Sequence, residues 1–255
     1  KRQDAGKDLK LEDELDIKDL TGKNDWIAIV HIDGNGLGKV VQQLGKDRKK
    51  FYQFSTLLDQ ATTKAANEAF KVIEEAHGFS YNKLPICPVV LGGDDLTAII
   101  RGDLALPYAK KFITEFERET SQGEMKNLLS KANMDKLTAC GGIAYIKASF
   151  PFYYGYKLAE ELCHAAKTDA KAINKENVPS CLMFHKVQDS FVQSYKDIKA
   201  RELELKPKDD GKGKTANKGQ EEPAKIKKTL CFGPYYLRKQ EGYHTISELE
   251  DMVNE

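Results

Sequence analysis

The sequence predicts an α+β domain with a βαββαβ core, in which an antiparallel sheet carries helices on one face, followed by extra C-terminal elements. Short runs rich in β-branched residues alternate with longer stretches of helical spacing, and glycine-rich breaks end the runs. Two of these runs are separated by four residues alone, which requires a hairpin. With 255 residues, 40% of them hydrophobic, the chain is long enough for one large domain with appendages.

The first predicted strand follows a charged segment. Residues 1–25 are polar and highly charged, and we interpret them as a leader or linker. The run WIAIVHID at 26–33 is typical of a strand buried on both faces. After a short basic loop, apolar residues recur at helical spacing over 51–73, which predicts a helix that His77 and Gly78 end.

A hairpin occupies the middle of the chain. The predicted strands at 84–91 and 96–101 are joined by Gly-Gly-Asp-Asp, whose glycines can supply the positive φ angles of a tight turn. The elements predicted after it are a helix at 105–119, a strand at 137–147, a helix at 150–173 and a strand at 180–187. This order is the signature of a ferredoxin-like, palm-type sheet, in which the first strand lies beside the third and runs antiparallel to it.

The C-terminal quarter gives a weaker pattern. We expect the palm-type domain to span 26–190 and an extension to span 191–255. Residues 207–228 have the Lys-, Gly- and Glu-rich composition of a disordered loop. Strand and turn character returns at 230–237, and a helix with Thr245 or Ser247 at its N-cap is predicted at the end.

Composition excludes several classes of protein. Lys+Arg 40 against Asp+Glu 39 gives a net charge of +1, so no global field attracts nucleic acid and any polyanion site must be local. No apolar stretch approaches the roughly 20 residues that span a bilayer, and no signal-peptide core is present, so we expect a cytoplasmic protein without a membrane partner. The five cysteines form no CxxC pair, which favours buried reduced thiols.

Three carboxylates are the candidate catalytic residues. Asp33 ends the first predicted strand, and Asp94 and Asp95 directly precede the third, so the expected sheet brings all three to one edge. Hard divalent ions prefer such oxygen ligands, which predicts a site for two Mg²⁺ or Mn²⁺ ions held by Asp33, Asp94, Asp95 and the backbone carbonyl of Ile32. The alternative is ordinary turn chemistry, because Asp and Gly are favoured turn residues.

Glycine-rich backbone beside these carboxylates is the candidate nucleotide-binding loop. It lies between a strand and a helical stretch, where exposed N–H groups favour phosphate. GNGLG is neither a Walker A sequence nor a complete dinucleotide fingerprint. The predicted nucleotide-binding residues of the two motifs are Gly34, Asn35, Gly36, Gly38, Gly92 and Gly93.

Lysines at four-residue spacing form a cationic stripe on the predicted helix at 150–173 and just beyond it. We expect Lys167 and Lys171 to contact phosphates and Lys175 to contribute less. Alternatively, these lysines complement the helix dipole and keep the surface soluble. The histidines show no ligand spacing and no His-Asp dyad occurs, which argues against an HD phosphohydrolase.

Three motifs carry a family resemblance: HIDGNGLG at 31–38, LGGDD at 91–95, and the stretch from GGIAYIK to TDAK at 141–171. Over residues 26 to about 187 the chain resembles the palm domain of the large subunit of type III CRISPR effector complexes, and more distantly GGDEF diguanylate cyclases. The resemblance implies conversion of ATP, with divalent ions, into cyclic oligoadenylate when the complex binds target RNA. It also implies that Asp33 and the GGDD aspartates bind metal and that Lys167 contacts phosphate.

That large subunit usually carries further parts that are not apparent in this sequence: a second palm, an HD nuclease domain, a zinc-binding segment and a helical domain. A second palm domain is therefore an expected partner, from a homodimer or from the rest of a longer chain, together with effector subunits, crRNA and target RNA. Two alternatives stay open. One is a catalytically silent palm that acts as scaffold or nucleotide sensor in a ribonucleoprotein. The other is a diguanylate-cyclase-like enzyme, disfavoured because LGGDD lacks the Glu-Phe ending.

Overall fold

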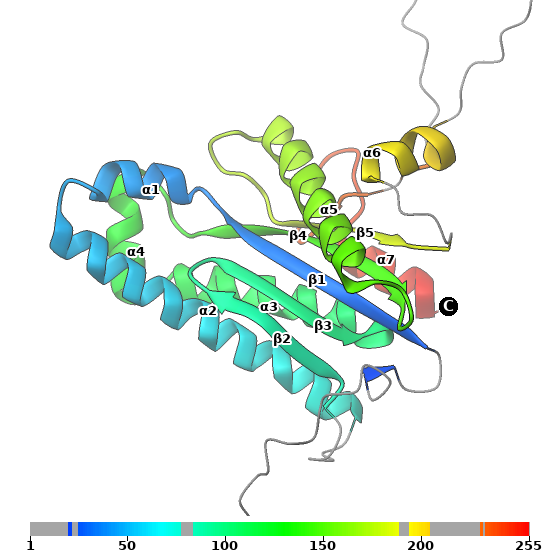
Figure 1. Cartoon of the computed structure of the whole chain (residues 1–255). Helices are drawn as coiled ribbons and strands as arrows, with labels where there is room; N and C mark the ends of the chain where they lie inside the picture. Colours follow the sequence, from blue (N-terminus) through cyan, green and yellow to red (C-terminus); the bar gives the residue numbers. More distant parts are fainter. Residues whose placement is uncertain are drawn as a thin grey trace, which may run out of the picture.

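A six-stranded sheet forms the middle of the molecule, in the strand order β2-β3-β1-β4-β5-β6 (Figure 1). The computed structural model describes residues 20–21, 25–77, 84–188, 194–204, 230–231 and 233–254. The strands are β1 (Trp26–Asn35), β2 (Ile86–Gly92), β3 (Asp95–Arg101), β4 (Thr138–Lys147), β5 (Cys181–Lys186) and β6 (Tyr235–Tyr236). Neighbouring strands are antiparallel except for the parallel pair β4 and β5. The predicted disordered loop at 207–228 and nearly all of the leader lie outside the described residues.

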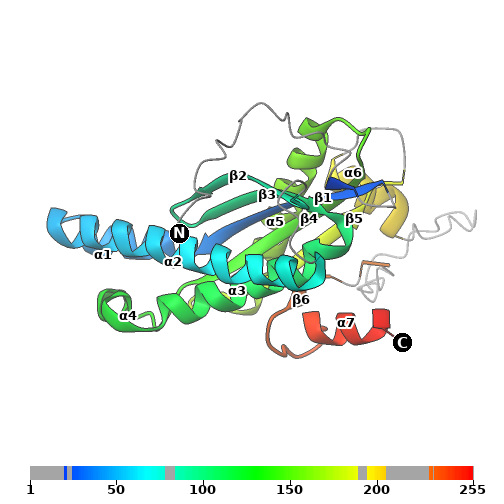
Figure 2. The same ribbon diagram turned by 90° about the horizontal axis from the view of Figure 1, so that it is seen from below.

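Helices cover both faces of the sheet. They are α1 (Leu37–Leu44), α2 (Arg48–His77), α3 (Ala105–Thr120), α4 (Gly123–Leu129), α5 (Phe152–Ile173), α6 (Tyr195–Ile198) and α7 (Ile246–Asn254). The two core helices, α2 and α3, pack side by side on one face, and α5 crosses the other (Figures 1 and 2). The predicted βαββαβ core is thus confirmed, with its helices α2 and α3 on one face, and α5 and β5 are the additional helix and strand behind it.

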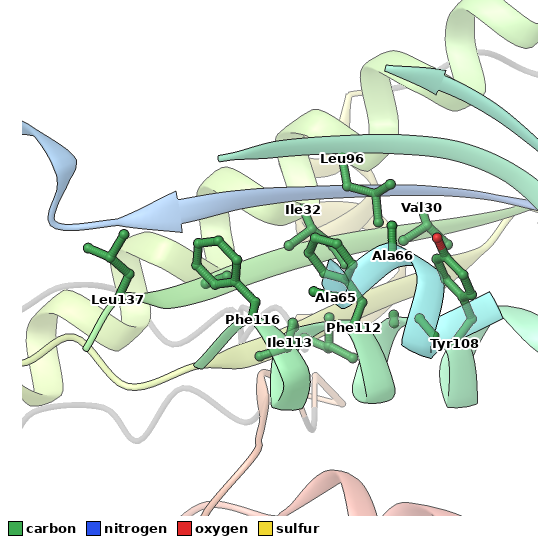
Figure 3. Packing of buried hydrophobic residues seen from close by; sticks show 14 of the residues in the cluster. Val30, Ile32, Ala65, Ala66, Leu96, Tyr108, Phe112, Ile113, Phe116 and Leu137 are labelled. Atoms are coloured by element: carbon green, nitrogen blue, oxygen red, sulfur yellow. The ribbon is translucent and has the colours of Figure 1, made fainter. Parts of the chain in front are cut away.

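Strand β1 lies at the centre because both of its faces are apolar. Val30 and Ile32 point into the core against α2 and α3, where Figure 3 shows them facing Phe112 and Phe116. Ile29, on the opposite face, packs under α5. Side chains alternate along a strand, so a strand covered on both sides carries a continuous apolar run, as WIAIVHID does.

The described residues include helices that the sequence pattern did not predict, namely α1, α4 and the short α6. Residues 37–44 form α1, which buries only Val40 and Leu44, too few to give a helical repeat. The polar break predicted after α3 contains α4. Strand β1 also runs past its predicted end to Asn35, because it continues to pair with β4 as far as Thr138.

The C-terminal extension packs onto the sheet edge. The predicted strand at 230–237 is reduced to β6, which pairs with β5. Helix α7 confirms the predicted terminal helix and starts with a capping box: the Glu248 N–H donates to Thr245 Oγ1 over 3.1 Å, and the Thr245 N–H donates to Glu248 Oε2 over 2.8 Å. None of the helices in the described part of the chain is both long and apolar enough to cross a membrane.

Gly142 allows α5 to lie unusually close to β4. A Cβ at this position would sit 2.0 Å from the carbonyl oxygen of Ala159 and 2.5 Å from the backbone nitrogen of Cys163. These neighbours are helix backbone, which cannot rotate away as a side chain would. The distance between α5 and the sheet therefore depends on a glycine at position 142. The positions of the α5 side chains relative to the sheet depend on it as well.

We predict that Gly142→Ala lowers the free energy of unfolding by about 3 kcal/mol, at the upper end of overpacking costs, because α5 must move off the sheet. Urea unfolding followed by circular dichroism measures this change. Gly38→Ala is the control, since a Cβ there meets no atom within 4 Å and alanine favours the α1 helix. Equal stability of Gly142→Ala and the wild-type protein would contradict the close packing.

Candidate metal and nucleotide site

Three carboxylates from two separate segments meet at one end of the sheet. Asp33, Asp94 and Asp95 each offer one oxygen, and these oxygens all lie within 4.8 Å of one another. Strands β1 and β3 pair as far as Ile32 opposite Leu96, so Asp33 is the next residue beyond the paired stretch and lies beside the hairpin turn. The convergence expected from the sequence is confirmed.

The hairpin turn is built to present Asp94. Gly92 ends β2, Asp95 starts β3, and Gly93 has a φ of +61°. A positive φ at the first central position is the pattern of a type II′ turn, which favours glycine there. The hydroxyl of Thr62, on α2, donates to the Gly93 carbonyl over 2.5 Å and ties the turn to the helix layer.

Gly34 lets the turn approach β1. A Cβ at Gly34 would lie 2.7 Å from the Cβ of Asp94, so any larger residue would push the two segments apart. The close approach of Asp33 and Asp94 therefore depends on a glycine at position 34, independently of any contact that Gly34 makes with a nucleotide.

Mutual repulsion and burial shift the protonation of the cluster. Burial, followed by the charges of Asp95 and Asp33, raises the pKa of Asp94 to about 6. Burial and the charge of Asp33 also raise the pKa of Asp95. A partly buried oxygen set with excess negative charge matches the ligands that Mg²⁺ and Mn²⁺ prefer, so these residues fit the predicted metal site.

Lys167 is the cation that the fold places against this cluster. Its Nζ forms an ion pair with Asp33 and donates to the backbone carbonyl of Gly34 over 2.8 Å. The Lys167 side chain is 16% exposed and the Asp33 side chain 36%, so the contact is partly shielded from solvent. The structure thus places Lys167 against Asp33, a contact that the sequence did not predict, and the role of Lys167 toward phosphate stays a prediction.

His31 is a neighbour of the site that sequence reasoning did not select. It lies two residues before Asp33 and therefore on the same face of β1. Its Nδ1 shares a hydrogen bond of 2.9 Å with the Thr97 hydroxyl, and its ring meets the edge of Tyr156 at 6.0 Å. The period of two along β1 was the signal that could have identified it.

Asn35 is held within the sheet. It is 3% exposed, and its amide nitrogen donates to Thr138 Oγ1 over 3.1 Å and to Cys140 Sγ over 3.3 Å. Its Oδ1 is buried without a hydrogen-bond partner. The structure thus shows Asn35 joining β1 to β4, and a contact with ribose or base stays a prediction. Ile32 is fully buried, and its carbonyl as a metal ligand likewise stays a prediction.

The remaining predicted residues lie around the start of α1. Gly36 is the N-cap, with a φ of +85° and no side-chain capping bond, and Gly38 lies in the first turn. Both line a cavity of about 680 Å³, and so do Lys171 and Lys175. The cavity thus brings the start of α1 together with two of the three lysines, whereas Asp33, Asp94 and Asp95 do not line it, and a contact of these residues with a nucleotide stays a prediction.

The family follows from a match of residues 26–177, more than half of the chain, to the model described as Cas10/Cmr2, second palm domain. The chain belongs to this family. The resemblance to the palm domain of the large subunit of type III CRISPR effector complexes is thereby confirmed, and the match includes the carboxylates, the glycine loop and Lys167.

Solved structures similar to this palm include Csm1 chains. One is the Csm1-Csm4 cassette in complex with cA4, at 18% identity and a TM-score of 0.43, covering 57% of this chain and 20% of that chain. Another is Csm1 in T.onnurineus, also at 18% identity and a TM-score of 0.43, covering 66% of this chain and 22% of that one. The palm thus spans about a fifth of these chains. No curated protein matches the sequence.

We predict that Asp94→Asn stabilises the palm near pH 7 without divalent ions. The pKa of Asp94 rises from an ordinary value of 3.8 to about 6 in the folded protein. Ionisation of this carboxyl therefore lowers the free energy of unfolding. The loss is absent below pH 3.8 and complete above pH 6. The gain at pH 7 should be about 1–2 kcal/mol after allowance for solvent screening, and it should vanish near pH 4. Urea unfolding at both pH values measures it. A destabilised variant at pH 7 would contradict the repulsion.

Proposed function

We propose that this palm is a metal-dependent nucleotidyltransferase that converts ATP into cyclic oligoadenylate with release of pyrophosphate, in a type III CRISPR antiviral response. The observation that carries the proposal is the meeting of Asp33, Asp94 and Asp95 within 4.8 Å, next to an uncapped helix start and a shielded lysine. Carboxylates without further function would not be expected to gather at a cost in repulsion.

In this proposal the chain contributes ligands and positions. Asp33, Asp94 and Asp95 would hold two Mg²⁺ or Mn²⁺ ions, which when bound activate a 3′-hydroxyl and neutralise charge on the phosphates. The backbone from Gly34 to Gly38 provides close approach, and the first N–H groups of α1, which lack a side-chain cap, would bind the triphosphate. Lys167 orients Asp33 and places positive charge beside the reacting phosphate. No side-chain general base is required.

The choice of ATP and of a cyclic product rests on the family. Membership in the Cas10/Cmr2 second palm family supports nucleotide chemistry in an effector complex, and one similar Csm1 structure was solved with cA4. A second palm domain is part of the proposal, because joining two nucleotides requires a second binding site. Effector subunits, crRNA and target RNA are the further partners proposed, in a cytoplasmic setting.

We predict that the chain forms pyrophosphate and linked adenylates from labelled ATP with Mn²⁺, and that Asp33→Asn or Asp94→Asn lowers the rate at least about 100-fold. Loss of a residue that merely supports a metal ligand already costs up to about 100-fold. Thin-layer chromatography of the products measures the rate, on the chain alone and with the effector partners. Asp59→Asn, an exposed α2 carboxylate, is the control.

Product formed equally by the Asp94→Asn variant would refute the proposed site. ATP binding by wild-type protein without product in either setting would instead identify the silent, sensor-type palm. A marked preference for GTP would revive the diguanylate-cyclase-like reading.

A second prediction concerns Lys167. Lys167→Ala removes the one cation paired with the cluster in the described structure, so Mn²⁺ without nucleotide should bind a few-fold more tightly while turnover falls. Titration calorimetry with Mn²⁺ and the product assay measure the two effects. Lys157→Ala, exposed on the same helix, is the control. Weaker Mn²⁺ binding in Lys167→Ala would contradict competition between lysine and metal for Asp33.

A further inference from the structure

A ring of charged side chains surrounds the cavity beyond the carboxylates. Its volume of about 680 Å³ is in the range of small-molecule sites. Five basic residues line it: Lys39, Lys136, Lys171, Lys175 and Arg238. The acidic residues along its wall are Glu117, Asp135 and Glu176. Positive charge therefore exceeds negative charge around this space.

One buried carboxylate holds two of these cations. Glu117 is 2% exposed, forms an ion pair with Lys136 and accepts from Arg238 Nη1 over 2.6 Å, while Ser180 Oγ donates to its other oxygen over 2.7 Å. A single negative charge cannot neutralise both partners, so one positive charge remains in surplus at the cavity wall. The Arg238 side chain is 63% exposed, which leaves much of its fork of donors accessible.

Lys171 on α5 and Lys175 just beyond its C-terminal end add to this surplus. Within the described residues, Lys171 and Lys175 form no ion pair, although both line the cavity. Lys39 is paired with Glu176 at the surface. The start of α1 at Gly36 and Gly38 also lines the cavity, and its first N–H groups lack a side-chain cap. The cavity thus combines the start of a helix with cationic side chains that form no ion pair in the described residues.

Helix α5 connects the cavity to the carboxylates. Lys167 contacts Asp33, and Lys171 lies one turn further along the helix, roughly 6 Å away along its axis. A triphosphate chain can bridge that separation. A nucleotide with its α-phosphate at the carboxylates would therefore extend its outer phosphates toward the cavity.

We propose that this cavity receives the β- and γ-phosphates of the nucleotide, and that Lys136 and Arg238 recognise the terminal phosphate. The inference rests on the proposed function for the position of the α-phosphate. Arg238 suits the role because a planar guanidinium can bind phosphate through two N–H groups while Glu117 holds it in place. Neither residue belongs to the motifs: one precedes β4, and the other is brought in by the extension, where the Leu237 N–H donates to Ser180 O over 2.9 Å.

The test compares ligands that differ in their outer phosphates. Calorimetry with Mn²⁺ would measure binding of α,β-methylene-ATP, which resists transfer, of AMP, and of inorganic tripolyphosphate. The variants are Arg238→Gln and Lys136→Gln, with Lys239→Gln as the matched control, because Lys239 pairs with Glu248 and does not line the cavity. Thermal melts confirm that each variant is folded.

We expect Arg238→Gln and Lys136→Gln each to weaken the ATP analogue about tenfold, the effect of a lost charged hydrogen bond, without changing AMP binding. Arg238→Lys should restore part of the loss. Analogue binding by Arg238→Gln equal to that of Lys239→Gln would overturn the inference while leaving the carboxylate site intact.

An Asp94→Asn/Asp95→Asn double variant separates this inference from the proposed function. If it still binds tripolyphosphate in an Arg238-dependent manner, the cavity is an anion site in its own right, even should the nucleotide chemistry fail. If neither the analogue nor tripolyphosphate binds to wild-type protein, the cavity inference fails.

Discussion

The fold of this palm must hold three carboxylates that repel one another, Asp33, Asp94 and Asp95, close together. Burial of Asp94, together with the charges of Asp95 and Asp33, raises its pKa to about 6. Backbone pairing holds the carboxylates together: β1 is paired along both edges, and the β2–β3 hairpin is anchored to α2 through Thr62. Hydrogen bonds within the protein thus hold the carboxylates in place, and these bonds do not involve a bound cation.

The cation that relieves this repulsion comes from the opposite face of the sheet from α2 and α3. Lys167 reaches Asp33 only because α5 lies close to β4, and that closeness requires the missing side chain at Gly142. Two glycines, Gly34 and Gly142, therefore set the distances within the site. Their role is to keep backbone segments close, which no side chain could do in their place.

The sequence predicted the features that depend on strand order. Once the βαββαβ pattern was recognised, the ends of the first and third strands had to meet, so the carboxylates could be placed together although they lie far apart in the chain. It did not predict α1, which buries only two residues, or the burial of Asn35, which follows from β1 extending beyond its apolar run. Lys136, Glu117 and Arg238 belong to no local motif, so only the folded chain brings them together.

The shared carboxylate of Glu117 also explains how a ligand-binding arginine can be compatible with a stable fold. An unpaired charge at 2% exposure would be costly, so Glu117 needs at least one cation and its bond from Ser180. Lys136 contributes one such cation from within the palm, and Arg238 contributes the second while its exposed N–H groups remain available to a phosphate. The C-terminal extension can therefore contribute Arg238 to the cavity, because the buried charge of Glu117 is already paired with Lys136 of the palm.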